Sequence, residues 1–273
     1  MNCGHDLTNP SASAKMRLSL FPEDRNMCCF SGKVQLVADT NIFARASKDG
    51  RQFLVYSMRL DTKSEVAMIL PIPTPKNSKE DAVKFINLKD YAGFFDDMRR
   101  GFPVPPSRGG LSLSGAEPPA AAKIKVVEVG NFIASFVPAI KDFSRLDEKF
   151  RLSTDVWDKL PQYKNWGFAV FQLKKGEHKI HPMAFEFPRA VPKSLFFPTV
   201  HIHDGKVHEK AKFDHMLFAQ FTGGEMVPDW EESPQPAELF LTKLPKAEGI
   251  VAGKDHVYRK IMQGTMKNTD VVV

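Results

Sequence analysis

The sequence predicts an α+β protein made of two β-rich lobes and a few helices, packed as one compact body. The chain has 273 residues and 42% of them are hydrophobic, so it is long enough to bury a sizeable core. Phenylalanine supplies much of the apolar mass, with 22 Phe against 4 Tyr and 3 Trp, and aromatic side chains favour the pleated surface of a sheet. Apolar runs rich in β-branched residues recur between turn residues, as in a protein built mainly of strands.

The first part of the chain contains an arm and a lobe. Residues 1–26 are polar and lack periodicity, which predicts a flexible N-terminal arm. Met27 directly precedes Cys28, so the sequence leaves open whether Met1 or Met27 is the physiological start. Residues 27–102 form the first β-rich lobe, with strands expected at 33–45, 51–60 and 65–73 and helices at 77–88 and 91–102.

The second part begins with a linker. Residues 103–122 are rich in Pro, Gly, Ser and Ala and carry almost no charge, which predicts a loop between the lobes. The second lobe covers 123–221, with a strand expected at 124–138, a helix around 142–161 and a histidine-rich hairpin. The extension 222–273 is expected to be partly helical, at 237–244 and 254–266, and to fray at its end.

The two lobes share an internal echo. Residues 51–73 align without gaps within the segment 165–188, at an offset of 115 that matches them with 166–188, and apolar or aromatic character is kept at many of the aligned positions. Identical residues occur at the pairs Phe53/Phe168, Val55/Val170, Met68/Met183 and Pro73/Pro188. Two explanations stay open: a duplicated β-hairpin unit, or two apolar hairpins that match by pattern alone.

The strongest chemical signal is the stretch HIHDGKVHEKAKFDH at 201–215, which holds four of the eight histidines. Asp204-Gly205 between alternating residues predicts a two-residue hairpin turn. In that register His201 faces His208 across the ladder, and His203 lies on the same side one pleat along. Three imidazoles so arranged can bind zinc or iron, with Asp214, His215 or His181 completing the site.

This stretch supports two hypotheses of different classes. The first is a metal-dependent enzyme that activates water or oxygen at His201, His203 and His208, on a small-molecule or peptide substrate. The second is a non-catalytic binding or scaffold protein in which the same histidines form the solvent side of an amphipathic hairpin. Lysines on the histidine face favour the second, because they lie unfavourably close to a dication.

A third hypothesis rests on the adjacent cysteines of CCFSG, residues 28–32. Neighbouring strand residues face opposite sides, so at most one of Cys28 and Cys29 can serve a site. That residue is a candidate nucleophile of a cysteine-dependent hydrolase or transferase, with His181 or His201 as activating base. The alternative is that both are ordinary buried cysteines.

Charge and targeting signals narrow the partners. The 38 basic and 32 acidic residues are interspersed, so the net charge of +6 forms no basic stripe and nucleic acid is not an expected partner. No segment has the length or apolarity of a signal peptide or membrane span. The chain has only three cysteines, an odd number, which argues against a disulfide framework. We expect a cytoplasmic protein that does not bind membranes; its oligomeric state stays open.

Several of these segments together resemble an uncharacterised bacterial protein family. They are CCFSG, AMILPIP, HPMAFEFP and FFPTVHIHDG, within residues 28–221. The resemblance implies a β-rich globular fold and brings no functional residues with it.

Overall fold

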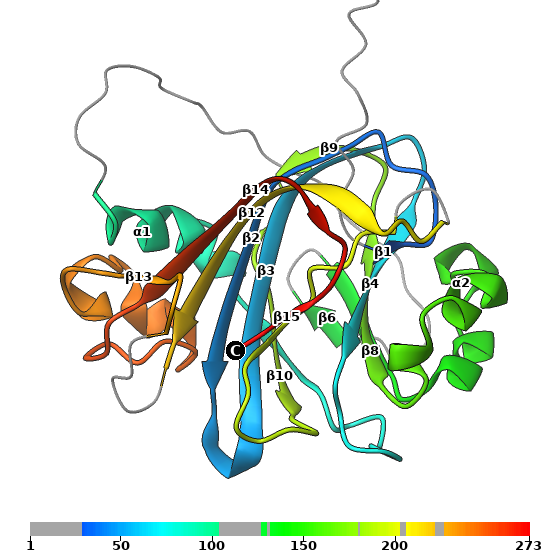
Figure 1. Cartoon of the computed structure of the whole chain (residues 1–273), viewed down its shortest axis with the longest axis horizontal. Coiled ribbons are helices and arrows are strands. Elements are labelled where there is room, and N and C mark those ends of the chain that lie inside the picture. Colours follow the sequence, from blue (N-terminus) through cyan, green and yellow to red (C-terminus); the bar gives the residue numbers. More distant parts are fainter. Residues whose placement is uncertain (1–28, 104–126, 130–131, 180, 203–205, 222–226) are drawn as a thin grey trace, which may run out of the picture.

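The computed structural model describes residues 29–103, 127–129, 132–179, 181–202, 206–221 and 227–273. Two β-sheets pack face to face, and short helices cover the outer side of each sheet (Figure 1). The β-rich α+β class expected from the sequence is confirmed at this level. The expected arm at 1–26 and most of the linker at 103–122 lie outside the described residues.

The first sheet, sheet A, has five strands in the order β1, β4, β8, β7, β6, and every pairing in it is antiparallel. These strands are Cys29–Phe30, Val66–Ile72, Gly167–Leu173, Phe132–Val137 and Val127–Val129. β4 and β8 read as nearly continuous apolar runs, which is typical of strands buried on both faces.

The second sheet, sheet B, runs in the order β13, β14, β12, β2, β3, β10, β5, and β9 pairs with the far end of β3. Its pairings are antiparallel except for the parallel pair β12 and β2. The strands are Glu231–Glu232, Tyr258–Lys267, Lys210–Gln220, Leu36–Ala46, Arg51–Thr62, Met183–Pro188, Lys84–Asn87 and, for β9, Gly176–Lys179. A small third sheet pairs β11, Phe196–Phe197, with β15, Val271–Val272.

The main core fills the space between the two sheets. Alternate residues of β3 and β10, such as Tyr56 and Phe185, point toward sheet A, while Met68 and Phe171 of β4 and β8 point toward sheet B. Edge-to-face and tilted aromatic contacts run through this layer, which explains the phenylalanine content.

Each sheet also has an outer core. Helix α2, Thr154–Asp158, and the 3₁₀ helices Ile140–Arg145, Glu148–Phe150 and Pro161–Tyr163 cover sheet A. Helix α1, Phe94–Arg100, covers part of sheet B with the 3₁₀ helices Lys89–Tyr91, Ala237–Leu239 and Leu244–Ala247; a last 3₁₀ helix, Lys48–Gly50, joins β2 to β3. The expected helix at 91–102 is confirmed as α1, which ends before Gly101.

The expected lobes contribute to the same two sheets. β1 and β4 come from 27–102 and lie in sheet A beside strands from 123–221, while β2 and β3 lie in sheet B beside β10 and β12. Each sheet is therefore shared between the two segments, and neither segment has a sheet of its own.

The internal echo has a counterpart in the strand register. Tyr56 pairs with Met183 in sheet B, and Met68 pairs with Phe171 in sheet A. Adding 115 to Tyr56 gives Phe171, and subtracting 115 from Met183 gives Met68. The Tyr56–Met183 pair of sheet B thus corresponds, at the offset of 115, to the Phe171–Met68 pair of sheet A. All four residues point into the main core.

Three local expectations were wrong. Residues 84–87 of the expected helix at 77–88 form β5, because Phe85 and Ile86 pair with β10 at the sheet edge. Residues 258–266 of the expected helix at 254–266 lie in β14, Tyr258–Lys267, which pairs with β12 along ten residues. The C-terminal tail does not fray but pairs with β11. In each case tertiary pairing overrides local propensity.

Among the described residues, no helix combines the length and apolarity that a membrane crossing requires.

Candidate functional site

Two of the predicted ligands, His201 and His215, meet in the core between the sheets. His201 lies in the segment after β11 and His215 lies in β12, and each is 1% exposed. Their Nε2 atoms are 3.5 Å apart and their rings are nearly parallel. Burial and the adjacent His201 lower the pKa of His215 well below its ordinary value, so His215 is neutral at physiological pH. One neutral imidazole can donate its Nε2–H to the other.

The side chain of His208 does not join this pair, because His208 is exposed while His201 is buried. The segment at 201–202 runs beside β1, where Ile202 bridges Cys29 and its carbonyl accepts from the Phe30 N–H at 3.0 Å. The expectation that His201 and His208 share the solvent face of one hairpin was therefore wrong. His203, Asp204 and Gly205 lie outside the described residues.

Asn268 explains why the two histidines do not pair across a ladder. Its side-chain amide donates to the carbonyls of both His201 and His208, each at 3.0 Å, and its Oδ1 accepts from the His201 N–H at 2.8 Å. The tail thus supplies the hydrogen bonds that a hairpin would have exchanged between its own strands.

Two other predicted site residues have local partners. His181 precedes β10, and its ring centroid lies 4.0 Å from that of Phe132. Asp214 lies inside β12, which begins at Lys210. Its Oδ2 accepts from the N–H of Asp39, which has a φ of 54° in the bulge of β2, and its Oδ1 lies 4.0 Å from His215 Nδ1.

For the metal hypothesis, the structure brings together two ring nitrogens, the Nε2 atoms of His201 and His215. In the part of the chain that the structure describes, which leaves out His203, no three or more His, Cys, Asp or Glu side chains are grouped so as to hold a metal ion.

Cys29, a predicted nucleophile, lies in the outer core of sheet A and is 1% exposed. Its Sγ lies 3.8 Å from the carbonyl oxygen of Val200. A thiol so deeply buried reacts only when the protein opens locally. Cys28 lies outside the described residues.

A buried polar network lies near Cys29, and no sequence pattern indicated it. Asp270 of the tail accepts from the Tyr163 hydroxyl at 2.6 Å and from the N–H groups of Thr199 and Val200 at 2.9 and 3.2 Å. Burial raises the pKa of Asp270 to about 6, and these hydrogen bonds oppose that rise. Burial, then Asp270 and Cys29, raise the pKa of Tyr163. The network fastens the tail to the segment that carries His201.

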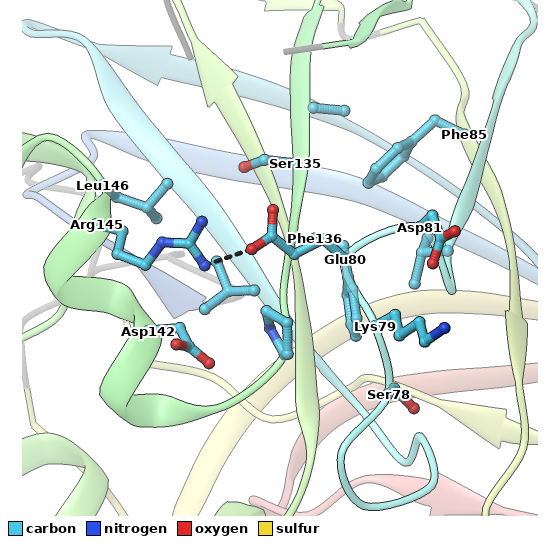
Figure 2. Close-up of a pocket in the computed structure, with 14 residues that line it drawn as sticks. Ser78, Lys79, Glu80, Asp81, Phe85, Ser135, Phe136, Asp142, Arg145 and Leu146 are labelled. Atoms are coloured by element: carbon cyan, nitrogen blue, oxygen red, sulfur yellow. Dashed lines mark hydrogen bonds and ion pairs between the residues drawn. The ribbon is translucent and has the colours of Figure 1, made fainter. Parts of the chain in front are cut away.

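An open pocket of about 790 Å³ lies where the edges of the two sheets approach each other (Figure 2). One wall is the loop before β5 together with Phe85, and the other is β7 with the 3₁₀ helix Ile140–Arg145. Figure 2 shows Arg145 reaching from the helix to Glu80 on the opposite wall, where they form an ion pair. This pair is exposed and contributes little to stability.

The interior of the pocket is partly apolar and partly polar. Val83, Phe85, Phe136 and Leu146 supply apolar surface, and charged side chains lie around it. Ser135 of β7 also lines the pocket, and its Oγ is buried without a hydrogen-bond partner in the described structure. Such an atom is left unsatisfied at an energetic cost unless a water or a ligand reaches it.

Two of the elements expected from the sequence contribute to this pocket. The strand expected at 124–138 includes β7, and the pocket loop at 77–83 lies within the helix expected at 77–88. In the structure this loop is not helical, and the Ser78 hydroxyl donates to Pro75 O, which closes a turn. Nothing in either segment shows that they face each other.

Comparison with known proteins found no matching family model and no matching curated protein. Among solved structures, that of baculovirus p35 is 12% identical to this chain. The match covers 90% of this chain and 98% of the p35 chain, with a TM-score of 0.48. A mutated baculovirus p35 after caspase cleavage has 15% identity, coverages of 87% and 97%, and a TM-score of 0.44. The structure of the caspase-8/p35 complex is 12% identical, the match covers 86% of this chain and 95% of that chain, and the TM-score is 0.43. Likenesses at this level assign no activity to the chain.

Proposed function

We propose that this protein is a binding protein without catalytic activity of its own, and that its ligand occupies the pocket between the β5 loop and β7. The observation that supports this most directly is that Ser135 lines an open pocket while its buried Oγ has no hydrogen-bond partner in the described structure. The pocket volume of about 790 Å³ lies within the range of ligand-binding sites.

The lining defines the chemistry of the ligand. Phe85 and Phe136 offer apolar contact, Ser135 offers a hydrogen bond, and the charged side chains are those of Arg145 and Lys79 together with the carboxylates of Glu80, Asp81 and Asp142. An aromatic or aliphatic group fits the apolar part, and an anionic substituent on it would pair with Arg145. The Arg145–Glu80 ion pair is exposed, so Arg145 can exchange Glu80 for a ligand anion with little loss.

Two of the predicted site residues support the same proposal. His201 is enclosed between the sheets and Cys29 lies in an outer core, and both are 1% exposed. The pocket, by contrast, is partly open, and charged side chains lie around it.

The aromatic anion 1-anilinonaphthalene-8-sulfonate is a suitable probe for the pocket. We expect its fluorescence to rise on binding to the folded protein, and Ser135→Phe to abolish the rise because the larger ring fills the cavity. Ser144→Phe is the matched control, since Ser144 is exposed on the adjacent 3₁₀ helix and does not line the pocket. Equal fluorescence from both variants, at unchanged melting temperature, would rule out this pocket as the binding site.

A protein partner can be tried in the same way. The likeness to p35 supports no function here, but caspase-8, which is bound to p35 in one of those structures, is a defined protein for a first measurement. Co-elution in size-exclusion chromatography that Ser135→Phe removes and Ser144→Phe keeps would identify a polypeptide ligand for the pocket.

A metal-dependent enzyme is the second candidate, favoured by the 3.5 Å separation of the Nε2 atoms of His201 and His215. Two nitrogens bound to one zinc ion at about 2.0–2.1 Å in tetrahedral geometry are about 3.4 Å apart. His203, Asp214 or His181 would have to complete the set. Metal analysis of untagged protein after zinc or iron supplementation tests it: about one equivalent that His215→Phe removes is expected, and less than about a tenth of an equivalent contradicts it.

We also infer that β3–β4 and β8–β10 are copies of one unit related by exchange of the two sheets. The matching registers of Tyr56–Met183 and Phe171–Met68 support this inference. Because equivalent core residues then occupy equivalent sites, we expect Leu70→Phe combined with Phe185→Leu to be tolerated better than either change alone, as measured by urea unfolding.

A further inference from the structure

The outer edge of β14 is open over most of its length. In sheet B the order is β13, β14, β12, and Figure 1 shows β14 lying beside β12. β13 pairs only with Arg259 and Tyr258, at the beginning of β14. Within the described ranges no strand pairs with the outer edge from Lys260 to Lys267.

Hydrogen bonds at both ends show which backbone groups point to this edge. Ser233 N–H donates to Val257 O, so residue 257 turns its carbonyl toward β13. Asn268 N–H donates to Glu209 O, so residue 268 turns its N–H toward β12. The register with β12 is unbroken between them, and strand residues alternate. The N–H and C=O groups of Ile261, Gln263 and Thr265 therefore point outward.

The side chains along the edge define two different faces. Ile261, Gln263, Thr265 and Lys267 are exposed on the face away from the main core. On the opposite face, Met262 is buried in the core and Met266 packs against it. A strand added at this edge would meet a polar, basic face on one side and methionine side chains on the other.

The polar face carries more positive than negative charge, with three lysines against Asp214 of β12. Lys210 and Lys267 are direct cross-strand partners, both exposed, and Lys212 lies two residues along β12 on the same face. Like charges placed directly opposite are destabilising, and none of these three lysines forms an ion pair with another described residue. Carboxylates on an added strand would relieve this repulsion.

We propose that the open edge of β14 binds an extended acidic segment of a partner protein by strand addition, a second binding function separate from the pocket. Main-chain hydrogen bonds to Ile261, Gln263 and Thr265 hold the segment. Its acidic residues lie on the side of Lys267 and Lys210, and its apolar residues lie on the side of Met262 and Met266.

A second copy of this chain is a poorer occupant on the same grounds. Antiparallel pairing of two copies centred on Gln263, which brings outward-pointing residues opposite each other, would place Lys267 of one copy opposite Arg259 of the other, where β13 already pairs. Lysine on an edge strand is a common protection against self-pairing of this kind.

The probe is the octapeptide acetyl-TEVEVEVT-amide, whose extended length of about 27 Å matches the open part of β14. Its Glu and Val side chains alternate as the two faces require. We expect binding in an NMR titration, with amide shifts concentrated at 260–267. The same peptide N-methylated at its three Glu residues lacks the donors that face β14 and should not bind.

The matched protein variants are Thr265→Pro and Thr265→Ala. Proline removes an outward N–H without removing a hydrogen bond to β12, so peptide affinity should fall at least about tenfold, while alanine should change it less than about twofold. If Thr265→Pro fails to fold, the N-methylated peptide gives the same test on the native protein.

The contribution of charge is tested separately with the double variant Lys267→Glu/Lys210→Glu. This variant should bind the Glu-containing peptide more weakly and should bind better a peptide with Lys in place of Glu. Equal binding of the N-methylated peptide, or shifts confined to the pocket at 78–85 and 134–146, would overturn the proposal. So would a dimer of the free protein that Thr265→Pro dissolves. The pocket variant Ser135→Phe should leave peptide binding unchanged, so failure of either proposal is visible independently of the other.

Discussion

Replacement of Asp270 by Asn should make the protein less sensitive to pH between about 4 and 7. The Asp270 carboxylate is buried, although the residue as a whole is partly exposed, and it accepts hydrogen bonds from Tyr163, Thr199 and Val200. Its pKa is raised from 3.8 to about 6, so ionisation is harder in the folded protein than in the unfolded chain. Stability from this group is complete below the unfolded pKa and is lost as pH rises through the folded pKa.

The size of the effect follows from the shift. A difference of about two pKa units corresponds to roughly 3 kcal/mol between the protonated and ionised states. In the Asp270→Asn variant the new side chain is not ionised at any pH. Its Oδ1 can still accept from the two backbone N–H groups while its amide donates to the Tyr163 oxygen. Wild type should therefore lose roughly 3 kcal/mol relative to Asp270→Asn as pH rises from 4 to 7.

Urea unfolding of both proteins at pH 4, 5, 6 and 7 measures this difference, because contributions from other titrating groups cancel between them. Asp229→Asn is the control, since the Asp229 side chain is 84% exposed and its removal should leave the curve parallel to wild type. Parallel curves for Asp270→Asn as well would refute the assignment of Asp270 as a buried carboxyl with a raised pKa.

Three further predictions concern the cores. The lowered pKa of His215 means that wild type loses stability as pH falls below about 6.5, and His215→Phe should lose less over that range in thermal melts; an equal loss would contradict a buried neutral imidazole. Gly167→Ala places a Cβ in steric conflict with the Phe136 ring and should lower the free energy of unfolding by about 1–3 kcal/mol, with no change as the contrary result. In a Cys3→Ser/Cys28→Ser background, Cys29 should resist iodoacetamide at neutral pH until the protein unfolds, whereas rapid labelling would favour the cysteine-dependent enzyme.

The central strands were predictable because their side chains alternate or are continuously apolar. The segments at 51–60 and 65–73 became β3 and β4, and the echo at offset 115 matched strands with the same register. What the sequence did not show is that β3 and β4 belong to different sheets. That depends on a turn at 63–65 which directs β4 to the opposite side of the core.

Elements at the margins were harder, since contacts from distant parts of the chain determine them. Tyr258–Lys267 is a strand because all ten of its residues pair with residues of β12, although Lys, Met and Gln favour helices. The helix expected at 142–161 breaks into short 3₁₀ and α segments, partly because the Arg151 guanidinium binds the carbonyls of Ser144 and Leu146.

The candidate site shows the same division. Alternation predicted that His201 and Val200 point to opposite sides, but both sides of that segment are buried between other elements. His215 was a named ligand and does meet His201, while the roles of Asn268 and Asp270 came from a tail expected to fray. The pocket depends on the segments 78–85 and 134–146, which lie about 50 residues apart in the sequence, and no local pattern links them.

Whether the pocket around Ser135 binds a ligand can be seen by NMR at the pocket residues themselves. On titration with 1-anilinonaphthalene-8-sulfonate, amide shifts of wild type should concentrate at 78–85 and 134–146 and should be absent in Ser135→Phe. Shifts spread over the surface, or centred on another part of the molecule in both proteins, would contradict binding at this pocket.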